Sequence, residues 1–438
     1  MTGSDTKPEW TFRPILQKGE KVSNPQPSRE FERAGHVHSI CGDPLQNSLD
    51  ARLDPDAPVV FEMGIWDGEH CLSQEEAAAY FGPELGRHIK AVYDENQTSK
   101  LDTFYQPLAF ITLEDFNTHG LIGKVDAFQL PWSDISDAAL KEINDNRFLW
   151  FNRAQNATSD AQDRRGSWGE GKFTLEWASR LGAQIAWSIR ADETEPRQVL
   201  MGQTTLRRHT IYAPGEGYGS VDNKGIITDR ANFAPYGYFS TTRFSDEGAD
   251  YAPLPVVDEG YISQFREKFR MVRDDEPGTS ILIPHPHEEI QNPSALARGI
   301  IARWLLAIHA GEVVVNIRKN GELVHSLSKE TIRSEVKALN WDVEEEKVGI
   351  GNERNPACRT VEQWIGILDL LDWAEDPPEE ATFHIDEAGG SHQPTWATPF
   401  WDTPEIERSL ERLREAFESG EPVKITAHPS VNSEKDGI

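Results

Sequence analysis

Closely spaced glycines, a lysine and a following helix combine in the middle of the chain in a way that suits an anion. The stretch consists of Arg165, Gly166, Ser167, Trp168, Gly169, Glu170, Gly171 and Lys172. Such glycines let successive backbone N–H groups turn toward one point, and a helix that starts directly afterwards adds unpaired N–H groups and a positive dipole end. Phe173, Trp177 and Leu181 recur every four residues, which predicts that helix. The stretch therefore predicts a phosphate cradle, with an ordinary strand-to-helix turn as the alternative.

This loop differs from the two common phosphate-binding motifs. In a Walker A loop the lysine is followed by serine or threonine, whereas Lys172 is followed by Phe173. A dinucleotide-binding loop follows a buried strand, whereas residues 159–165 are polar. A phosphate site at this loop is therefore of another kind.

Three oxygen-bearing side chains share one face of a predicted helix nearer the N-terminus. Asp43, Asn47 and Asp50 stand at i, i+4 and i+7, while Leu45 and Leu49 point elsewhere, into a core. A carboxylate and an amide one turn apart suit a magnesium ion, or a general base beside a metal ligand. The alternative is a solvated helix that starts here, with Asp43 as its N-cap and the following proline in its first turn.

Two further segments place polar groups at the ends of apolar strands. The strand over residues 108–113 is followed by Asp115, Gly120 and Gly123, which suits a carboxylate at the edge of a planar base with backbone close beneath it. A second buried strand is predicted over residues 277–284 and begins with a glycine and Thr279. For the first of these segments, a strand followed by an ordinary glycine turn is the alternative.

Composition limits the class of protein. A chain of 438 residues, 37% of them hydrophobic, can bury a large core and hold two domains. Its formal charge of −29 repels a nucleic-acid backbone, so we expect no direct nucleic-acid binding. No apolar run approaches the ~20 residues that cross a bilayer. The N-terminus lacks the apolar core of a secretory signal, and the 3 cysteines are too few for a disulfide framework. We therefore expect a cytoplasmic protein without a membrane segment.

The predicted elements divide the chain into three regions. Residues 1–28 carry several prolines among charged residues and are expected to form a flexible arm. Residues 29–292 hold the candidate groups and include a Gly-, Tyr-, Pro- and Asp-rich stretch, 213–258, that is expected to be an irregular insertion. Residues 293–438 are expected to form a smaller α+β domain that contains a helix, a hairpin and a polar tail.

The candidate segments stand in the order of four motifs of the GHKL superfamily of ATPases, which includes gyrase B, MutL, the ninety-kilodalton heat-shock chaperones and the MORC proteins. The run from Asn47 to Ala51 resembles the N box, in which the asparagine holds magnesium and an acid one turn earlier activates water. The run from Asp115 to Gly123 resembles the first glycine box, whose aspartate bonds the adenine amino group. The glycine-rich loop resembles the lid over the phosphates, and Thr279 resembles the threonine of the last box.

The resemblance implies that the chain binds ATP and Mg²⁺, with Asp43 as the catalytic base and Asn47 as the metal ligand. The implied nucleotide-binding residues are Asn47, Asp50, Ala51, Asp115, Gly120, Gly123, Gly166, Ser167, Trp168, Gly169, Glu170, Gly171, Lys172 and Thr279. The implied fold is an α/β sandwich, a mixed sheet with helices on one face, followed by an α+β domain of the transducer kind.

The resemblance also implies a mode of action. Members of this superfamily use hydrolysis to close and open a dimer, so we expect a homodimeric switch that acts on partner proteins. Partners of the nuclease, helicase or methyltransferase kind, in DNA transactions or phage defence, are the expectation. Two residues depart from the family pattern. Asp43 stands where glutamate is usual, which predicts slow hydrolysis, and Asn117 replaces a glycine, which requires a left-handed backbone there.

Two other functions stay open from the sequence. The chain is a nucleotide-binding or inactive scaffold if the shorter Asp43 no longer supports hydrolysis. It is a metal-dependent hydrolase if its two His-x-His pairs, His36 with His38 and His285 with His287, bind a metal ion.

Overall fold

The computed structural model describes thirteen stretches of the chain. They are residues 7–15, 35–92, 99–125, 146–152, 171–191, 195–212, 220–221, 227–228, 230–244, 251–342, 359–375, 380–386 and 424–430. The chain forms two compact units, Met1–Cys358 and Arg359–Ile438. The candidate site residues all lie in the first unit.

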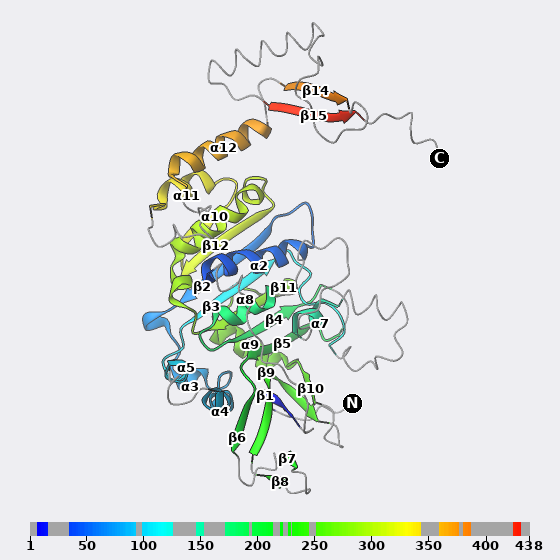
Figure 1. Cartoon of the computed structure of the whole chain (residues 1–438), viewed down its shortest axis with the longest axis vertical. Coiled ribbons are helices and arrows are strands. Elements are labelled where there is room, and N and C mark those ends of the chain that lie inside the picture. Colours follow the sequence, from blue (N-terminus) through cyan, green and yellow to red (C-terminus); the bar gives the residue numbers. More distant parts are fainter. Residues whose placement is uncertain are drawn as a thin grey trace, which may run out of the picture. The chain divides into compact units, whose positions relative to one another are not determined.

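The first unit is built on one large mixed sheet (Figure 1). Its strands are β1 (Glu9–Pro14), β2 (Val59–Trp66), β3 (Phe110–Phe116), β4 (Ala183–Ile189), β5 (Gln198–Thr205), β6 (His209–Tyr212), β9 (Arg230–Phe244), β10 (Tyr251–Leu254), β11 (Gly278–Pro284), β12 (Val313–Lys319) and β13 (Glu322–Leu327). The order is β1-β9-β5-β4-β11-β3-β2-β12-β13, and β6 and β10 also pair with β9. Every pairing among these described strands is antiparallel except that of β2 with β12. Two short strands, β7 (Ser220–Val221) and β8 (Ile227–Thr228), pair separately.

Helices cover this sheet. They are α2 (His36–Asp50), α3 (Gln74–Ala77), α4 (Pro83–Val92), α5 (Ser99–Phe104), α7 (Arg147–Asn152), α8 (Gly171–Ala178), α9 (Glu259–Lys268), α10 (Pro293–His309) and α11 (Ile332–Ala338), with 3₁₀ turns η1 (Gly68–His70) and η4 (Glu288–Gln291). Figure 1 shows α2 lying across β2, β3 and β11, with α8 beside it. The expected α/β class with a mixed sheet is confirmed.

Both faces of the sheet carry helices, whereas the sequence predicted helices on one face. Leu85 of α4 and Phe265 of α9 pack in one core cluster with Ile185 and Trp187 of β4. Successive strand residues point to opposite faces, so Ser188, next to Trp187, belongs to the other face. That other face carries the polar groups described below, and a thick apolar core supports them from behind.

The N-terminal arm and the expected insertion both contribute strands. Residues 9–14 of the expected flexible arm form β1, in which Trp10 and Phe12 are buried at alternate positions. Residues 230–244 of the expected insertion form the 15-residue strand β9, which buries Ala231, Phe233 and Phe239. Alternation with period two is the strand signature, and here prolines and glycines in both segments obscured it.

The expected domain boundary at residue 292 falls inside the first unit. Strand β12 pairs with β2 in parallel register from Val313 opposite Val59 to Lys319 opposite Ile65. Helix α10 connects β11 to β12, and β13 pairs with β12, so α10, β12 and β13 belong to the first unit. The second unit contains α12 (Val361–Glu375) and a parallel pair, β14 (Glu380–Asp386) with β15 (Lys424–Ser430).

A chain of buried histidines joins α4 to β6. His88 Nδ1 lies 2.6 Å from His209 Nε2, and His209 Nδ1 lies 2.7 Å from the carbonyl oxygen of Arg207. A carbonyl can only accept, so His209 carries its proton on Nδ1 and accepts from His88 through Nε2. The ring of Phe12 in β1 stacks on the ring of His88 with centroids 3.9 Å apart. A carboxylate oxygen of Glu84 lies 3.3 Å from His88 Nε2. Burial lowers the pKa of both imidazoles, that of His209 to about 4.

We expect this histidine pair to make the first unit sensitive to acid. An unfolded histidine titrates near 6.5, so between pH 6.5 and about 4 the unfolded chain binds more protons than the folded one. The free energy of unfolding therefore falls as pH falls through this window, by on the order of 3 kcal/mol for His209. In urea unfolding, the free energy of unfolding of the non-titrating variant His209→Gln should fall less steeply as the pH is lowered. Equal slopes for the two proteins would contradict the assignment.

Candidate functional site

Helix α2 runs unbroken through the candidate acid and amide. It begins at His36 after Gly35 and contains Pro44 within it, so Asp43 is an interior residue and not the N-cap. The alternative of a helix that starts at Asp43 is therefore wrong. Proline inside a helix costs ~3 kcal/mol, and burial of one side of α2 against the core offsets this cost. One continuous helix places Asn47 one turn beyond Asp43, as expected from their spacing.

Asp43 lies where three helices meet. The hydroxyl of Thr174 in α8 donates to Asp43 Oδ2 at 2.6 Å, and Arg303 of α10 brings a guanidinium nitrogen to 3.8 Å from Oδ1. Thr174 itself is buried, whereas the Asp43 side chain is 25% exposed. The carboxylate is thus held on one side and open to solvent on the other, which is the arrangement that a base acting on water needs.

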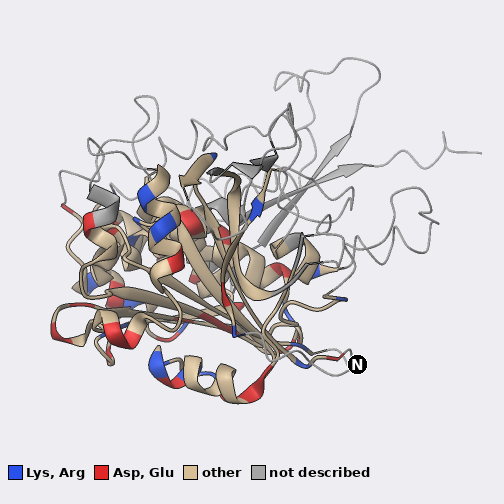
Figure 2. Cartoon of the chain, turned by 90° about the horizontal axis from the view of Figure 1, so that it is seen from below, with Lys and Arg blue, Asp and Glu red and all other residues tan. Residues whose placement is uncertain are grey.

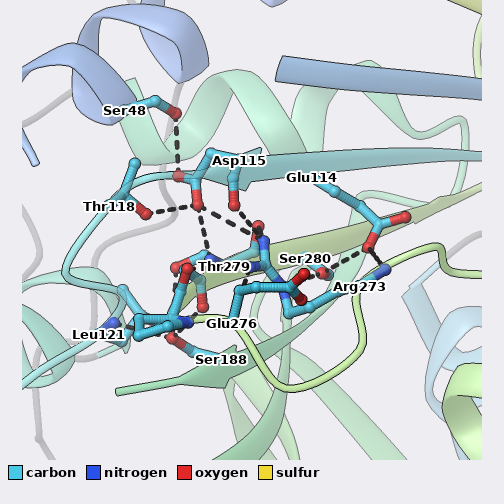
Figure 3. Close-up of polar contacts among 12 residues, drawn as sticks. Ser48, Glu114, Asp115, Thr118, Leu121, Ser188, Arg273, Glu276, Thr279 and Ser280 are labelled. Carbon is cyan, nitrogen blue, oxygen red and sulfur yellow. Dashed lines mark hydrogen bonds and ion pairs between the residues drawn. The ribbon is translucent and has the colours of Figure 1, made fainter. Parts of the chain in front are cut away.

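Asp115, at the end of β3, is the polar centre of the adjoining sheet face (Figure 3). Its Oδ1 accepts from the hydroxyl of Thr118 at 2.7 Å and from the backbone N–H of Thr279 at 2.7 Å. Its Oδ2 accepts from the hydroxyl of Ser48 at 2.9 Å. That hydroxyl also lies 3.0 Å from the carbonyl oxygen of Pro44. Because a hydroxyl has one proton, Ser48 can turn to Pro44 and release Oδ2 for another donor.

A buried arginine holds the Asp115 junction from behind. Arg273 is fully buried, and its guanidinium donates to the carbonyl oxygens of Asp115 and Thr279 and lies 3.7 Å from Asp115 Oδ1. Its other N–H groups donate to the Ser280 hydroxyl and to the carbonyl oxygens of Glu276 and Pro277. Glu114 fixes the same turn by accepting the backbone N–H of Arg273 at 3.1 Å. Removing such a buried donor set leaves several carbonyls unpaired, so these contacts fix the position of Asp115.

The turn after Asp115 has the left-handed backbone conformation that the sequence predicted at Asn117. Asn117 has a φ of 61°, the left-handed conformation, and its side-chain amide binds carbonyls of the loop from Asp54 to Pro58. Gly120 has a φ of 66°, and a Cβ there would overlap the carbonyl oxygen of Ile189. The close approach at Gly120 is therefore to the neighbouring strand β4.

The structure gathers part of the predicted set. Asp43, Asn47 and Asp50 lie on α2 and Ala51 follows it, Asp115 lies near the end of β3 with Gly120 and Gly123 in the turn after it, and Thr279 lies at the start of β11. Asp115 contacts Thr279 directly and α2 through Ser48. Gly171 and Lys172 begin α8. Outside the described residues lie Gly166, Ser167, Trp168, Gly169 and Glu170. Residues that the sequence reasoning did not assign are Ser48, Thr118, Thr174, Ser188, Arg273 and Arg303.

Only some of the unassigned residues left a signal in the sequence. Ser48 lies between Asn47 and Asp50 and is buried on the inner side of the same helix. Ser188 is one of two polar residues, with Gln184, in the otherwise apolar strand β4, and its hydroxyl donates to the carbonyl of Gly278 at 2.8 Å. Arg273 has no local pattern that distinguishes it from an exposed arginine.

The histidine pairs do not form a metal centre in the part of the chain that the structure describes. His36 and His287 stack with ring centroids 3.8 Å apart, and His38 Nε2 faces Arg303 at 3.1 Å. Within the described ranges no group of three or more His, Cys, Asp or Glu side chains is placed to hold a metal ion. The stacked rings instead join the start of α2 to the turn after β11.

Charged residues of both signs are interspersed along the described elements (Figure 2). No helix among these elements is long and apolar enough to span a bilayer.

Comparison with known proteins gives a likeness to solved structures and no match of another kind. No protein-family model and no curated protein matches the chain. Among solved structures, the chain is similar to the 43K ATPase domain of Thermus thermophilus gyrase B in complex with an aminocoumarin, at 13% sequence identity and a TM-score of 0.25. The match covers 72% of this chain and 51% of that one, so this chain spans about half the length of that structure.

Proposed function

We propose that this chain binds ATP with magnesium on the sheet face that carries Asp115, beside α2 and α8, and hydrolyses it slowly. The observation that carries the proposal is the Ser48 hydroxyl, which shares its proton between Asp115 Oδ2 and the Pro44 carbonyl. An incoming amino group can take Oδ2 without leaving any polar group unpaired. The exocyclic amine of adenine is a donor of this kind, and its ring would lie at the edge of β3.

The residues present fit a magnesium nucleotide. Mg²⁺ keeps most of its waters and phosphate ligands and needs one or two protein oxygens, which matches a single amide, Asn47, exposed on α2. The ion would neutralise charge on the phosphates. The first turn of α8, which begins at Gly171, lies close to Asp43, because Thr174 of that turn bonds Asp43. The first N–H groups of a helix have no partner within the helix, so they would be available to a phosphate. Asp43 would accept the proton of the attacking water.

We further propose that the bound nucleotide works as a switch. Thr174 of α8 contacts Asp43 of α2 directly, so a nucleotide that orders the start of α8 changes the surroundings of the base. Closure of a homodimer is the output that we propose for this change. The protein partners and the role in phage defence stay predictions from the resemblance.

The variant Asp115→Asn tests the adenine contact. An amide in place of the carboxylate removes a charge-assisted acceptor, so ATP binding should weaken by about 1.5 to 3 kcal/mol, roughly tenfold or more. Calorimetric titration of MgATP into both proteins measures the effect. Asp274→Asn, which changes a 78% exposed acid, is the matched control. Unchanged affinity in Asp115→Asn would remove the adenine contact, and wild-type protein that binds no MgATP would overturn the proposed function.

A further inference from the structure

An arginine from α10 reaches the candidate base by passing over Gly42 of α2, which has no side chain. The indole N–H of Trp304 donates to the carbonyl oxygen of Cys41 at 2.7 Å, which fixes α10 against α2. The next residue back, Arg303, therefore lies directly over the turn that contains Gly42 and Asp43. Its guanidinium nitrogens lie 3.1 Å from His38 Nε2 and 3.8 Å from Asp43 Oδ1.

Gly42 creates the space for this arginine. A Cβ at position 42 would overlap the guanidinium of Arg303. Gly42 is buried in the interior of α2, where glycine is less favourable than alanine. The close approach of the guanidinium gives a physical reason for glycine at this place.

Arg303 and Thr174 act on different oxygens of Asp43. Thr174 forms a short hydrogen bond to Oδ2, whereas Arg303 stands 3.8 Å from Oδ1, beyond a direct hydrogen bond. Oδ1 therefore keeps a lone pair for water while a positive charge stays close. His38 holds the guanidinium by accepting its N–H, which requires a neutral ring, and burial lowers the pKa of His38.

We infer that Arg303 is a positioning residue that keeps a positive charge beside the Asp43 carboxylate when phosphates are bound. The inference rests on the proposed function. Bound phosphates add negative charge near Asp43, and the adjacent guanidinium offsets that charge. Among the described residues, the groups that face Asp43 are Arg303 from α10, His38 from α2 and Thr174 from α8.

The test is the pH dependence of turnover in full-length variants. In Arg303→Gln the acid limb of the kcat profile should move to higher pH, with at least a roughly fivefold loss of kcat on that limb, the size expected for a partly exposed charge pair. The affinity for MgATP should change less than kcat. Arg303→Lys, which keeps the charge, should restore most of the wild-type profile.

Two glycine variants separate this role from general packing. Gly42→Ala displaces only the flexible end of Arg303 and adds a better helix former, so it should fold well and still shift the acid limb as Arg303→Gln does. Gly299→Ala is the control, because its Cβ meets Cys41 and Val37 in the same helix contact but leaves Arg303 in place. An unmoved acid limb in Arg303→Gln and Gly42→Ala, in a protein that hydrolyses ATP, would overturn the role of Arg303 alone. Absence of turnover in the wild type would instead overturn hydrolysis as the proposed function.

Discussion

Replacing Asp43 with asparagine is expected to reduce ATP hydrolysis by ~10²–10⁴-fold, the usual contribution of a general base, while MgATP still binds. Asparagine can still accept the Thr174 hydroxyl through its amide oxygen, so the junction of α2 and α8 should persist. It cannot take up a proton from water. A steady-state phosphate-release assay, paired with a nucleotide-binding measurement, gives both quantities.

The Asp43 experiment also distinguishes an ATPase from a nucleotide-binding scaffold that does not hydrolyse ATP. Aspartate is shorter than glutamate by about 1.5 Å, one C–C bond, so even the wild type should turn over slowly. Asp102→Asn, an exposed acid on α5, is the control for the chemical change alone. Full turnover in Asp43→Asn would exclude Asp43 as the base. MgATP binding without turnover in the wild type would favour the nucleotide-binding scaffold.

The variant Asn47→Ala is expected to remove the dependence of nucleotide binding on magnesium. Asn47 is exposed on α2, so its truncation leaves the core intact and places a better helix former on the surface. The amide oxygen that we assign to Mg²⁺ is lost, and turnover should fall below detection. Titrations of ATP with magnesium and with a chelator should differ for the wild type and coincide for the variant.

The residue before Asn47 on α2 provides a control variant. Gln46→Ala truncates an amide on the same helix one position earlier, where the side chain points to a different side. This variant should keep the wild-type response to magnesium. If Asn47→Ala responds to magnesium as the wild type does, the metal ligand lies elsewhere.

Local sequence patterns predicted the centre of the fold and left its edges undetermined. The strands β3 and β11 each contain a short apolar stretch, and the polar site residues adjoin it in the sequence, Asp115 after the stretch in β3 and Thr279 before the one in β11. In contrast, β1 and β9 are long-range partners whose prolines and glycines resemble loop residues. Their strand conformation depends on burial of Trp10 and Phe239 against a distant helix layer, which no local window contains.

The candidate site divides in the same way. Asp43, Asn47 and Asp115 could be predicted because spacing on a helix or position at a strand end is a local property. Arg273 and Arg303 could not, because an arginine that fills a buried junction has the same sequence appearance as one in solvent. Pro44 was misleading for a related reason, since burial of α2 keeps the helix continuous where local propensity would start it.

The parallel pairing of β2 with β12 has a practical consequence for anyone who expresses a fragment of this protein. Cutting the chain at residue 292 would remove α10 and β12 and leave β2 as a bare sheet edge. Val59, Phe61, Met63 and Ile65 are all buried on this strand, so the cut would expose apolar side chains beside unpaired backbone groups. Edges of this kind recruit other chains into intermolecular sheets. A fragment that ends after the first compact unit, at residue 358, retains the covering strand and should stay monodisperse where the shorter one aggregates.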